Sequence, residues 1–167
     1  QTRFSVPFEN VQMDTTPILK DNLLMGTAYV ARFDFSTKKD EQIIVSTAIS
    51  GVSMEGAAKN LQAEVPENDF DKYRLLAKET WNKELSKIKV ESEDKDDKTV
   101  FYTALYHSML APTIYSDVDG QYYGPDQKVH QAENWTNYST FSLWDTFRAS
   151  HPLFTYTQPE RTNDMIK

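Results

Sequence analysis

The stretch YSTFSLWDTFRASHP, residues 138–152, gathers side chains that could bind a polar organic ligand. It places a carboxylate, Asp145, directly after Trp144, with Arg148 and His151 following within the same segment. Aromatic faces pack against apolar C–H surfaces, and a carboxylate or a guanidinium can bridge pairs of hydroxyl groups. This combination suits a sugar, although it identifies no reaction.

The same residues also fit a helix that packs in a protein core. If residues 140–150 are helical, Trp144, Arg148 and His151 fall along one stripe, and Asp145 can pair with Arg148. Such a pair is expected in a core, because an unpaired buried carboxylate costs several kcal/mol. From spacing alone, the core helix and the ligand-binding wall both remain open.

Other motifs that could carry chemistry are weaker. The loop SDVDG, residues 116–120, offers oxygen ligands, but position 12 of an EF-hand counted from Asp117 is Lys128 rather than Glu. Asp119-Gly120 instead predicts a type I′ hairpin turn. The three histidines share no metal-ligand spacing, and a G-x-S-x-G motif is absent. The sequence therefore predicts neither a metal site nor a catalytic nucleophile within this chain.

Composition excludes several partners. The chain carries 18 Lys and Arg against 25 Asp and Glu, a formal charge of -7, and has no basic run that nucleic acid or an anionic membrane would bind. It has no cysteine, which excludes disulfides and thiolate metal sites. No apolar run approaches the roughly 18 residues that a membrane span needs. The first residues, QTRFSVPFEN, lack the basic and apolar regions of a signal peptide.

The core is lean for a self-contained domain. Counted without tyrosine and with glycine, the apolar share is about 37%, below the roughly 45–50% usual in globular proteins. The last segment, PERTNDMIK, begins like a helix and shows no helix end. We therefore expect the chain to be part of a larger protein.

Strand patterns come first along the chain and helix patterns follow. Apolar and polar residues alternate over 29–35 and 43–49, with polar STKKDE between them, which predicts a hairpin with one buried face. Ser53 precedes MEGAAKNLQAE, which is typical of a short helix, and Asp69 is a typical N-cap of the next helix. The expected helices cover residues 54–64, 70–88, 97–111 and 140–150, and a further helix begins near Pro159. This order favours two domains joined by the helix near residues 69–90.

Three blocks of the sequence resemble glycoside hydrolase family 92, the calcium-dependent, exo-acting α-mannosidases. They are GVSMEGAAKNLQAEVPENDFDKYRLLAKETWNKELSKIKVE, FYTALYHSMLAPTIYSDVDGQYYGPDQKVH and YSTFSLWDTFRASHPLFTYTQPERTNDMI. They stand in the family's order, and FSLWDTFR with the following HPL is the most specific of them. The likeness covers roughly residues 29–167, and residues 1–28 add little to it.

The resemblance implies an α+β fragment. Residues 1–51 would be the end of an N-terminal β-sandwich, residues 52–96 connecting helices, and residues 97–167 the first helices of an incomplete (α/α)6 toroid. In this family the active site lies between the sandwich and the toroid. The strand-then-helix order predicted from the residues agrees with that arrangement.

The resemblance also implies a function, the hydrolysis of terminal α-linked mannose with inversion by a calcium-dependent enzyme. Trp144 and Asp145 would lie in the subsite that holds the terminal mannose, with Arg148 and His151 lining or supporting it. The family's acid and base carboxylates and most of its calcium ligands come from segments after Lys167, so no residue here is given a catalytic role and the fragment alone is expected to be inactive.

The partners implied are mannose-containing glycans and the rest of the same polypeptide, and the location implied is secreted or periplasmic. Two other classes of function stay open on the residues alone. One is a carbohydrate-binding module without catalysis, and the other is a helical interaction or scaffold domain. A binder would gain stability with sugar, whereas a scaffold would not.

Overall fold

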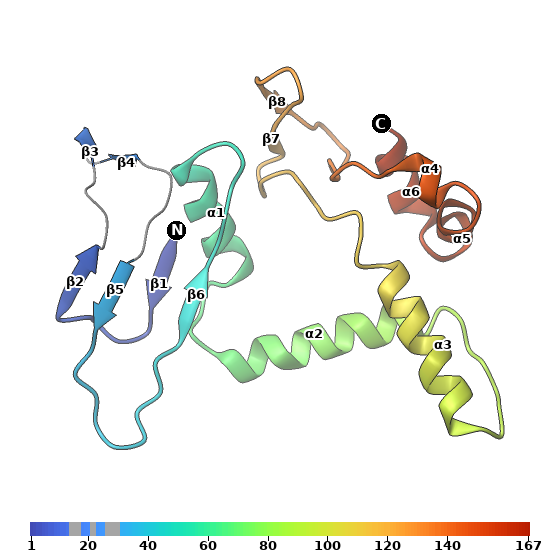
Figure 1. The fold of residues 1–167 in the computed structure, drawn as a ribbon, viewed down its shortest axis with the longest axis horizontal. Helices are drawn as coiled ribbons and strands as arrows, with labels where there is room; N and C mark the ends of the chain where they lie inside the picture. The colour runs from blue at the N-terminus through green and yellow to red at the C-terminus, as the bar shows by residue number, and fades with distance from the viewer. Residues whose placement is uncertain (14–17, 21–22, 26–30) are drawn as a thin grey trace. The chain divides into compact units, whose positions relative to one another are not determined.

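The computed structural model describes residues 1–13, 18–20, 23–25 and 31–167. It divides into two compact units, one formed by Thr2–Thr47 and the other by Ala48–Lys167 together with Gln1. Figure 1 shows the short strands β1 to β6 of the first unit, and the six helices and the β7–β8 hairpin of the second.

The first unit consists of short antiparallel strand pairs. Its strands are β1 (Thr2–Phe4), β2 (Asn10–Met13), β3 (Ile18–Lys20), β4 (Leu23–Met25), β5 (Ala31–Asp34) and β6 (Val45–Thr47). They pair as β1–β6, β2–β5 and β3–β4. An aromatic cluster joins two of these pairs, since the ring centroid of Phe4 lies 4.7 Å from that of Phe33 and 5.3 Å from that of Phe35. Phe33 and Phe35 thus share one face, as their alternation predicts.

The predicted hairpin of residues 29–35 with 43–49 is wrong in its pairing. Strands do form within both segments, but β5 pairs with β2 and β6 pairs with β1. The partners come from the first residues of the chain, whose sequence shows no period, and the long-range contact of Phe4 with Phe33 accompanies this choice. Tyr29 and Val30, which belong to the predicted strand, lie outside the described residues.

The buried face of β6 also differs from a simple apolar one. Ser46 is buried, whereas Val45 is 53% exposed and Ile49, just beyond the strand, is 89% exposed. Alternation alone gives two faces and does not say which of them meets the rest of the unit.

The second unit contains all the helices. They are α1 (Met54–Glu64), α2 (Phe70–Leu85), α3 (Lys95–Ser108), α4 (Leu143–Thr146), α5 (Ser150–Thr157) and α6 (Pro159–Ile166). The predicted N-cap Asp69 is confirmed, because its carboxylate accepts a hydrogen bond from the backbone N–H of Lys72, and the Ser53 hydroxyl caps α1 by accepting one from the backbone N–H of Gly56. Each satisfies a donor that the first helical turn leaves free.

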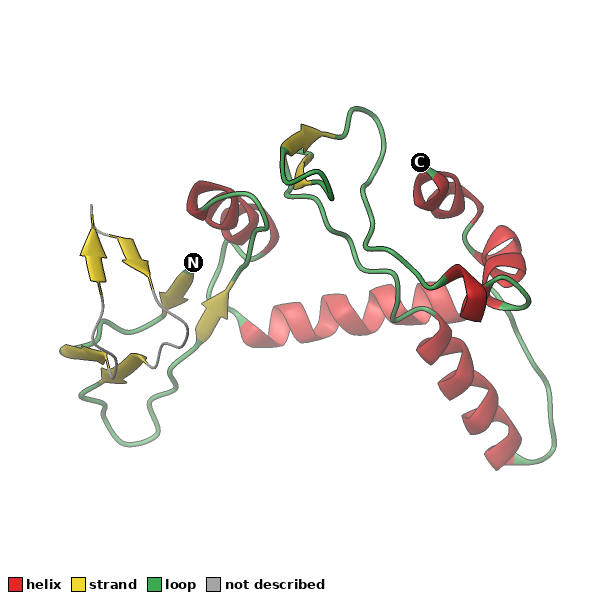
Figure 2. Ribbon diagram, turned by 45° about the horizontal axis from the view of Figure 1, so that its top comes forward, coloured by secondary structure: helices red, strands yellow, loops and turns green. Residues whose placement is uncertain are grey.

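The apolar stripe predicted along α2 is packed at only one end. Phe70 is 68% exposed and Leu76 is 47% exposed, while Trp81 is half-buried with its ring centroid 4.6 Å from that of Tyr106 on α3. The helix ends at Leu85, short of the predicted residue 88, and its C-terminal part meets α3 (Figure 2). The α2–α3 contact therefore rests on a few aromatic and apolar residues near that end.

A hairpin of β7 (Gln121–Tyr123) and β8 (Val129–Gln131) follows α3. The two strands are connected by a turn at Gly124-Pro125-Asp126, closed by the hydrogen bond from the Gly124 N–H to the Lys128 carbonyl oxygen. The chain turns at Asp119-Gly120 as predicted, but the type I′ hairpin expected there is wrong, because β7 pairs with β8 rather than with residues 114–118. Gly120 has φ 83° whereas Asp119 is not among the described non-glycine residues with positive φ, and a type I′ turn needs both.

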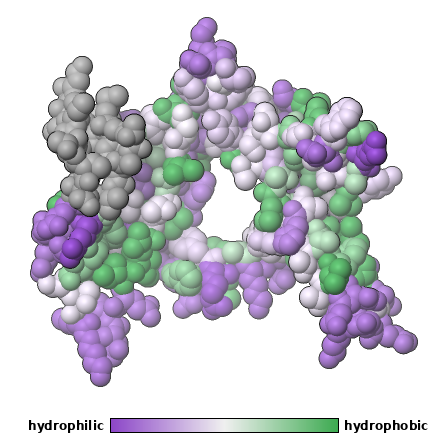
Figure 3. All heavy atoms as spheres, in the orientation of Figure 1, coloured by the Kyte–Doolittle hydropathy of each residue, from purple (hydrophilic) through white to green (hydrophobic). Residues whose placement is uncertain are grey.

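Many apolar side chains of the second unit lie at its surface. Figure 3 shows hydrophobic residues interspersed with hydrophilic ones on the viewed face. Among the most exposed are Trp144 at 86% and Tyr156 at 87%. None of the helices in the described ranges combines the length and the apolar character that crossing a bilayer requires.

Candidate functional site

The segment that carries the predicted binding residues is not one helix. Backbone from Thr140 to Ser142 is non-helical, α4 is a single turn, and α5 begins anew at Ser150 after Ala149, whose φ is -132°. The prediction of a helix over 140–150 that ends at Pro152 is therefore wrong. Pro152 instead occupies the first turn of α5, where a proline costs no hydrogen bond because its missing N–H would have had no partner.

Because the helix is interrupted between α4 and α5, Trp144, Arg148 and His151 do not form the single helical stripe that the sequence predicts. Trp144 and Arg148 both approach Phe147, with ring centroids of Trp144 and Phe147 6.4 Å apart and the Arg148 guanidinium 5.3 Å from the Phe147 ring. Leu143 is 64% exposed and Phe147 is 51% exposed. These side chains form an open aromatic and cationic surface rather than a core.

Asp145 lies on the same turn and is exposed. The Asp145–Arg148 pair expected of a core helix is not formed among the described residues. The backbone N–H of Asp145 donates to the carbonyl oxygen of Ser142 at 3.1 Å, which closes the turn. The Asp145 carboxylate accepts no hydrogen bond and forms no ion pair with the described part of the chain.

His151 lies on the inner side of the segment. Its ring centroid is 4.9 Å from that of Phe141 and 6.2 Å from that of Phe154, which is 1% exposed. Its Nδ1 is a buried polar atom without a hydrogen-bond partner in the described part of the chain. Trp144, Asp145 and Arg148 thus lie close along one exposed turn, whereas His151 packs under it.

Unlike the exposed Asp145, the carboxylate of Asp117 is buried. Asp117 is 6% exposed and accepts hydrogen bonds from the Ser50 hydroxyl at 2.6 Å and from the Asn60 side-chain amide at 2.8 Å. The Asn60 side chain also accepts a bond from the Val118 N–H at 2.9 Å. We call Ser50, Asn60 and Asp117 the polar knot. It fixes the N-terminal half of the loop before β7 to α1.

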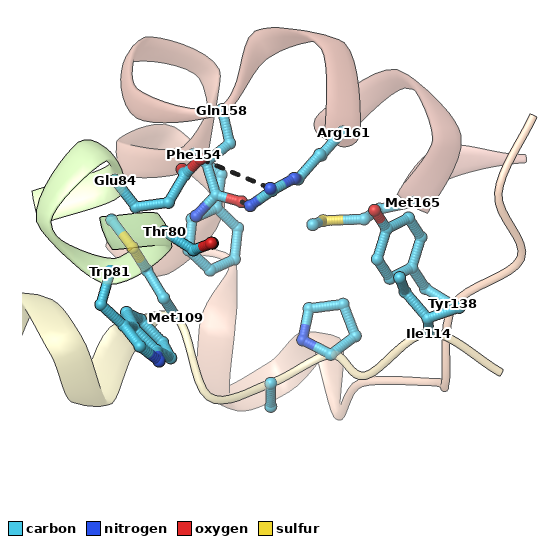
Figure 4. A pocket seen from close by; sticks show the side chains of 12 residues that line it. Thr80, Trp81, Glu84, Met109, Ile114, Tyr138, Phe154, Gln158, Arg161 and Met165 are labelled. Atoms are coloured by element: carbon cyan, nitrogen blue, oxygen red, sulfur yellow. Dashed lines mark hydrogen bonds and ion pairs between the residues drawn. The ribbon is translucent and has the colours of Figure 1, made fainter. Parts of the chain in front are cut away.

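A pocket of about 250 Å³ lies between the end of α2, the segment after α3 and the helices α5 and α6 (Figure 4). Trp81, Met109, Phe154 and Met165 supply much of its apolar wall. Arg161 reaches into its rim, where it donates to Gln158 at 3.2 Å and to Glu84 at 3.4 Å. The pocket therefore has an apolar wall and one ion pair that ties α2 to α6.

The ion pair gives a prediction about pH. Burial alone would raise the pKa of Glu84, but the hydrogen bond from Lys87 and the charges of Arg161, Lys87 and Lys83 outweigh it, and the pKa is lowered. A carboxylate with a lowered folded-state pKa stabilises the fold above its ordinary value of about 4.3, and that contribution is lost as the pH falls through the folded-state pKa. We expect Glu84→Gln to flatten the fall in thermal midpoint of the complete enzyme between pH 7 and pH 3. Identical slopes for variant and wild type would show that the pair contributes nothing.

Sequence reasoning missed three features of this unit. In the polar knot, Asp117 lies 57 positions from Asn60 and 67 positions from Ser50. No local sequence pattern reveals contacts between residues so far apart. The pocket in Figure 4 also forms from distant segments. The tyrosines around β7, in contrast, stand close together in IYSDVDGQYYGP and give a signal that could have been used.

Comparison with known proteins shows where these residues fall. A family model described as the glycosyl hydrolase family 92 catalytic domain matches residues 56–167. These residues include most of α1, the β7–β8 hairpin and residues 144–148, which we call the WDTFR turn. No curated protein matches the chain.

Solved structures match over nearly the whole chain. A family GH92 α-mannosidase from Bacteroides thetaiotaomicron is similar at 36% identity and TM-score 0.82, over 95% of this chain and 22% of its own. The same enzyme in complex with mannoimidazole gives 36% identity and TM-score 0.80 over the same shares. Another GH92 family glycosyl hydrolase is similar at 26% identity and TM-score 0.77, over 99% of this chain and 22% of its own. The chain thus spans about a fifth of the length of the structures it matches.

Proposed function

The chain belongs to glycosyl hydrolase family 92, and from this membership we propose that the enzyme containing it hydrolyses terminal α-linked mannose in glycans. The observation that carries the proposal is the likeness to the α-mannosidase that has been solved with mannoimidazole. A helical scaffold and a sugar-binding module without catalysis are both less favoured, because the matching family model is that of a catalytic domain. The glycan substrate is recognised by aromatic stacking and by hydrogen bonds to charged side chains, both of which the WDTFR turn can provide.

This chain contributes part of the wall that holds the terminal mannose. The exposed indole of Trp144 stacks on the apolar face of the sugar, and the carboxylate of Asp145 accepts hydrogen bonds from neighbouring hydroxyls. Arg148 lies over Phe147 at the same surface and can donate to a sugar oxygen. His151 lines the site from beneath, where its unpartnered Nδ1 can hold one further polar atom.

The reaction proposed is hydrolysis with inversion. A carboxylic acid donates its proton to the glycosidic oxygen as the bond from that oxygen to C1 breaks, and a carboxylate base takes a proton from the water whose oxygen bonds to C1 from the opposite face. Two carboxyl groups roughly 6.5–9.5 Å apart are needed for this. We assign neither to this chain, and both would come from the rest of the polypeptide.

The stereochemistry tests the proposal. The complete enzyme is expected to release β-mannose first from an α-mannobioside, which proton NMR detects before the anomers equilibrate. Release of α-mannose would contradict inversion while leaving α-mannosidase activity intact. Absence of cleavage of any α-mannoside would contradict the function itself.

Calcium dependence is the second part of the proposal. Among the described residues, no three acidic, histidine or cysteine side chains gather where they could hold a metal ion. These residues therefore do not fit a calcium site, and the ligands would belong to the rest of the polypeptide. A bound calcium would hold sugar hydroxyls through oxygen coordination.

Chelation gives the corresponding prediction. Dialysis of the complete enzyme against a calcium chelator is expected to lower kcat/KM on an α-mannobioside at least tenfold, and added calcium should restore it. Magnesium is expected to restore little, because it demands a tighter octahedral geometry and dehydrates reluctantly. Full activity after exhaustive chelation would remove the metal from the proposal.

We further propose the family architecture for the chain's place in the enzyme. Residues 1–51 would close a β-sandwich, residues 52–96 would connect, and residues 97–167 would start an (α/α)6 toroid, in a secreted or periplasmic protein. The change from short strands to helices along the chain supports this order. An experimental structure of the complete enzyme in which residues 97–167 lie outside a helical toroid would overturn it.

A further inference from the structure

A groove lined by tyrosines lies beside the β7–β8 hairpin. Its lining includes Tyr115, Tyr122, Tyr123, Asn137 and Thr140, and we call it the tyrosine groove. Its volume is about 340 Å³, within the range of roughly 300–1,000 Å³ typical of small-molecule sites. Tyr115 and Tyr123 are 47% and 40% exposed, so their rings are accessible from solvent.

The chemistry of the lining indicates a neutral ligand rich in hydroxyl groups. The residues around the groove comprise tyrosines, Gly124, Pro125, Asn137, Ser139 and Thr140, and none of them carries a charge at neutral pH. A phosphate, a metal ion or a charged peptide would find no counter-charge there. The hydroxyls of Tyr115 and Tyr123 and the side-chain amide of Asn137 form no hydrogen bond with the described part of the chain, and they can pair with ligand hydroxyls.

The frame of the groove is fixed by contacts on several sides. Tyr122 stacks on His130 with ring centroids 5.5 Å apart and meets Trp135 edge-on at 5.8 Å. The backbone N–H of Tyr115 donates to the carbonyl oxygen of Asn137 at 2.8 Å, so the two walls are hydrogen-bonded to each other. The Tyr122 ring, which is held in place before binding, loses little conformational entropy on contact with a ligand.

The groove is also continuous with the WDTFR turn along the chain. Ser139 and Thr140 line it, and the same extended segment leads through Ser142 directly to Trp144. We propose that the tyrosine groove is a second carbohydrate subsite, which holds a sugar ring of the glycan further along the chain than the terminal mannose. This inference rests on the proposed function, because it takes the terminal mannose to lie at Trp144 and Asp145.

The test compares a long and a short substrate in the complete enzyme. Tyr115→Ala and Tyr123→Ala are expected to lower kcat/KM on linear α-mannotriose about tenfold each, the scale of one lost aromatic contact. The loss should appear in KM, and kcat/KM on an aryl α-mannoside, which has no second sugar, should be unchanged. Tyr156→Ala removes a tyrosine of α5 that is 87% exposed and lies outside the groove, and it should alter kcat/KM on neither substrate.

Two results would overturn the subsite. One is an equal loss on mannotriose and on the aryl mannoside, which would mean that the substitutions disturb the terminal site or the fold. The other is no loss on either. If a tyrosine variant fails to fold, as its thermal unfolding would reveal, Asn137→Ala carries the same comparison, because its side chain makes no bond to the described residues.

Failure of the proposed function would look different. In that case the wild-type enzyme would cleave neither substrate, and the groove would be tested by titrating mannotriose into wild type and Tyr123→Ala. Weaker binding by the variant would support a sugar subsite without the hydrolase activity. Equal binding, or none to the wild type, would overturn the subsite as well.

Discussion

In the complete enzyme, Asp145→Ala is expected to lower kcat/KM on an α-mannoside about 10²–10⁴-fold. Hydrogen bonds to a charged group are worth about 1.5–3 kcal/mol each, and a carboxylate that bridges two sugar hydroxyls loses both at once. Each 1.36 kcal/mol corresponds to a tenfold change in rate. If those bonds strengthen as the ring distorts toward the transition state, the loss falls mainly on kcat, and steady-state kinetics separate the two parameters.

Asp145→Ala is expected to change ligand binding without changing the stability of the fold. Asp145 is exposed and forms no ion pair among the described residues, so its removal should leave the thermal midpoint unchanged. Asp71→Ala is a control, since Asp71 is another aspartate in the first turn of a helix; its side chain is 78% exposed, and its pair with Arg74 at 3.1 Å lies at the surface, where it adds little stability. Wild-type kinetics for Asp145→Ala would take Asp145 out of the site.

Local signals predicted where α1 and α2 begin, because the start of a helix depends on residues close in sequence. Ser53 and Asp69 cap α1 and α2 through the backbone N–H three residues on, and both partners lie within four residues of sequence. Strand pairing depends on residues distant in sequence, since β5 pairs with β2 and β6 pairs with β1, both at the start of the chain. The alternation of apolar and polar residues in one strand does not indicate which other strand it pairs with.

The candidate site divides in the same way. The residue types at Trp144 and Asp145 already indicated a sugar, but the i, i+4 spacing around them indicated a helix that does not form. The break before Ser150 depends on where α5 packs, through Phe154 and Thr157, both buried. Periodicity without that packing could not distinguish an exposed binding turn from a core helix.

The polar knot leads to the second large expected effect. Asp117→Ala would leave the Ser50 hydroxyl and one donor of the Asn60 amide without their acceptor in a buried place. Leaving buried polar groups unpaired costs about 1–3 kcal/mol each, and more where a charged partner was lost. Because Asp117 follows Tyr115 and anchors the loop to α1, the loss should loosen both α1 and one wall of the tyrosine groove.

Hydrogen exchange on the complete enzyme measures this loss residue by residue. For Asp117→Ala we expect the amides of α1 and of residues 116–120 to exchange about 10²-fold faster, which is about 3 kcal/mol of local opening. Gly56→Ala should act in the same direction, because a methyl group there would collide with the Asp117 carboxylate and the Ser50 hydroxyl.

The neighbouring aspartate separates the knot from a general effect of lost charge. Asp119 pairs with Lys59 at 2.7 Å, but the two side chains are 29% and 56% exposed, so the pair is screened by solvent. Asp119→Ala should therefore change exchange in α1 much less than Asp117→Ala does. Equal effects of the two substitutions would mean that α1 is held by surface charge rather than by the buried knot. A selective effect of Asp117→Ala on α1, accompanied by a raised KM for mannotriose alone, would tie the knot to the tyrosine groove whose wall it anchors.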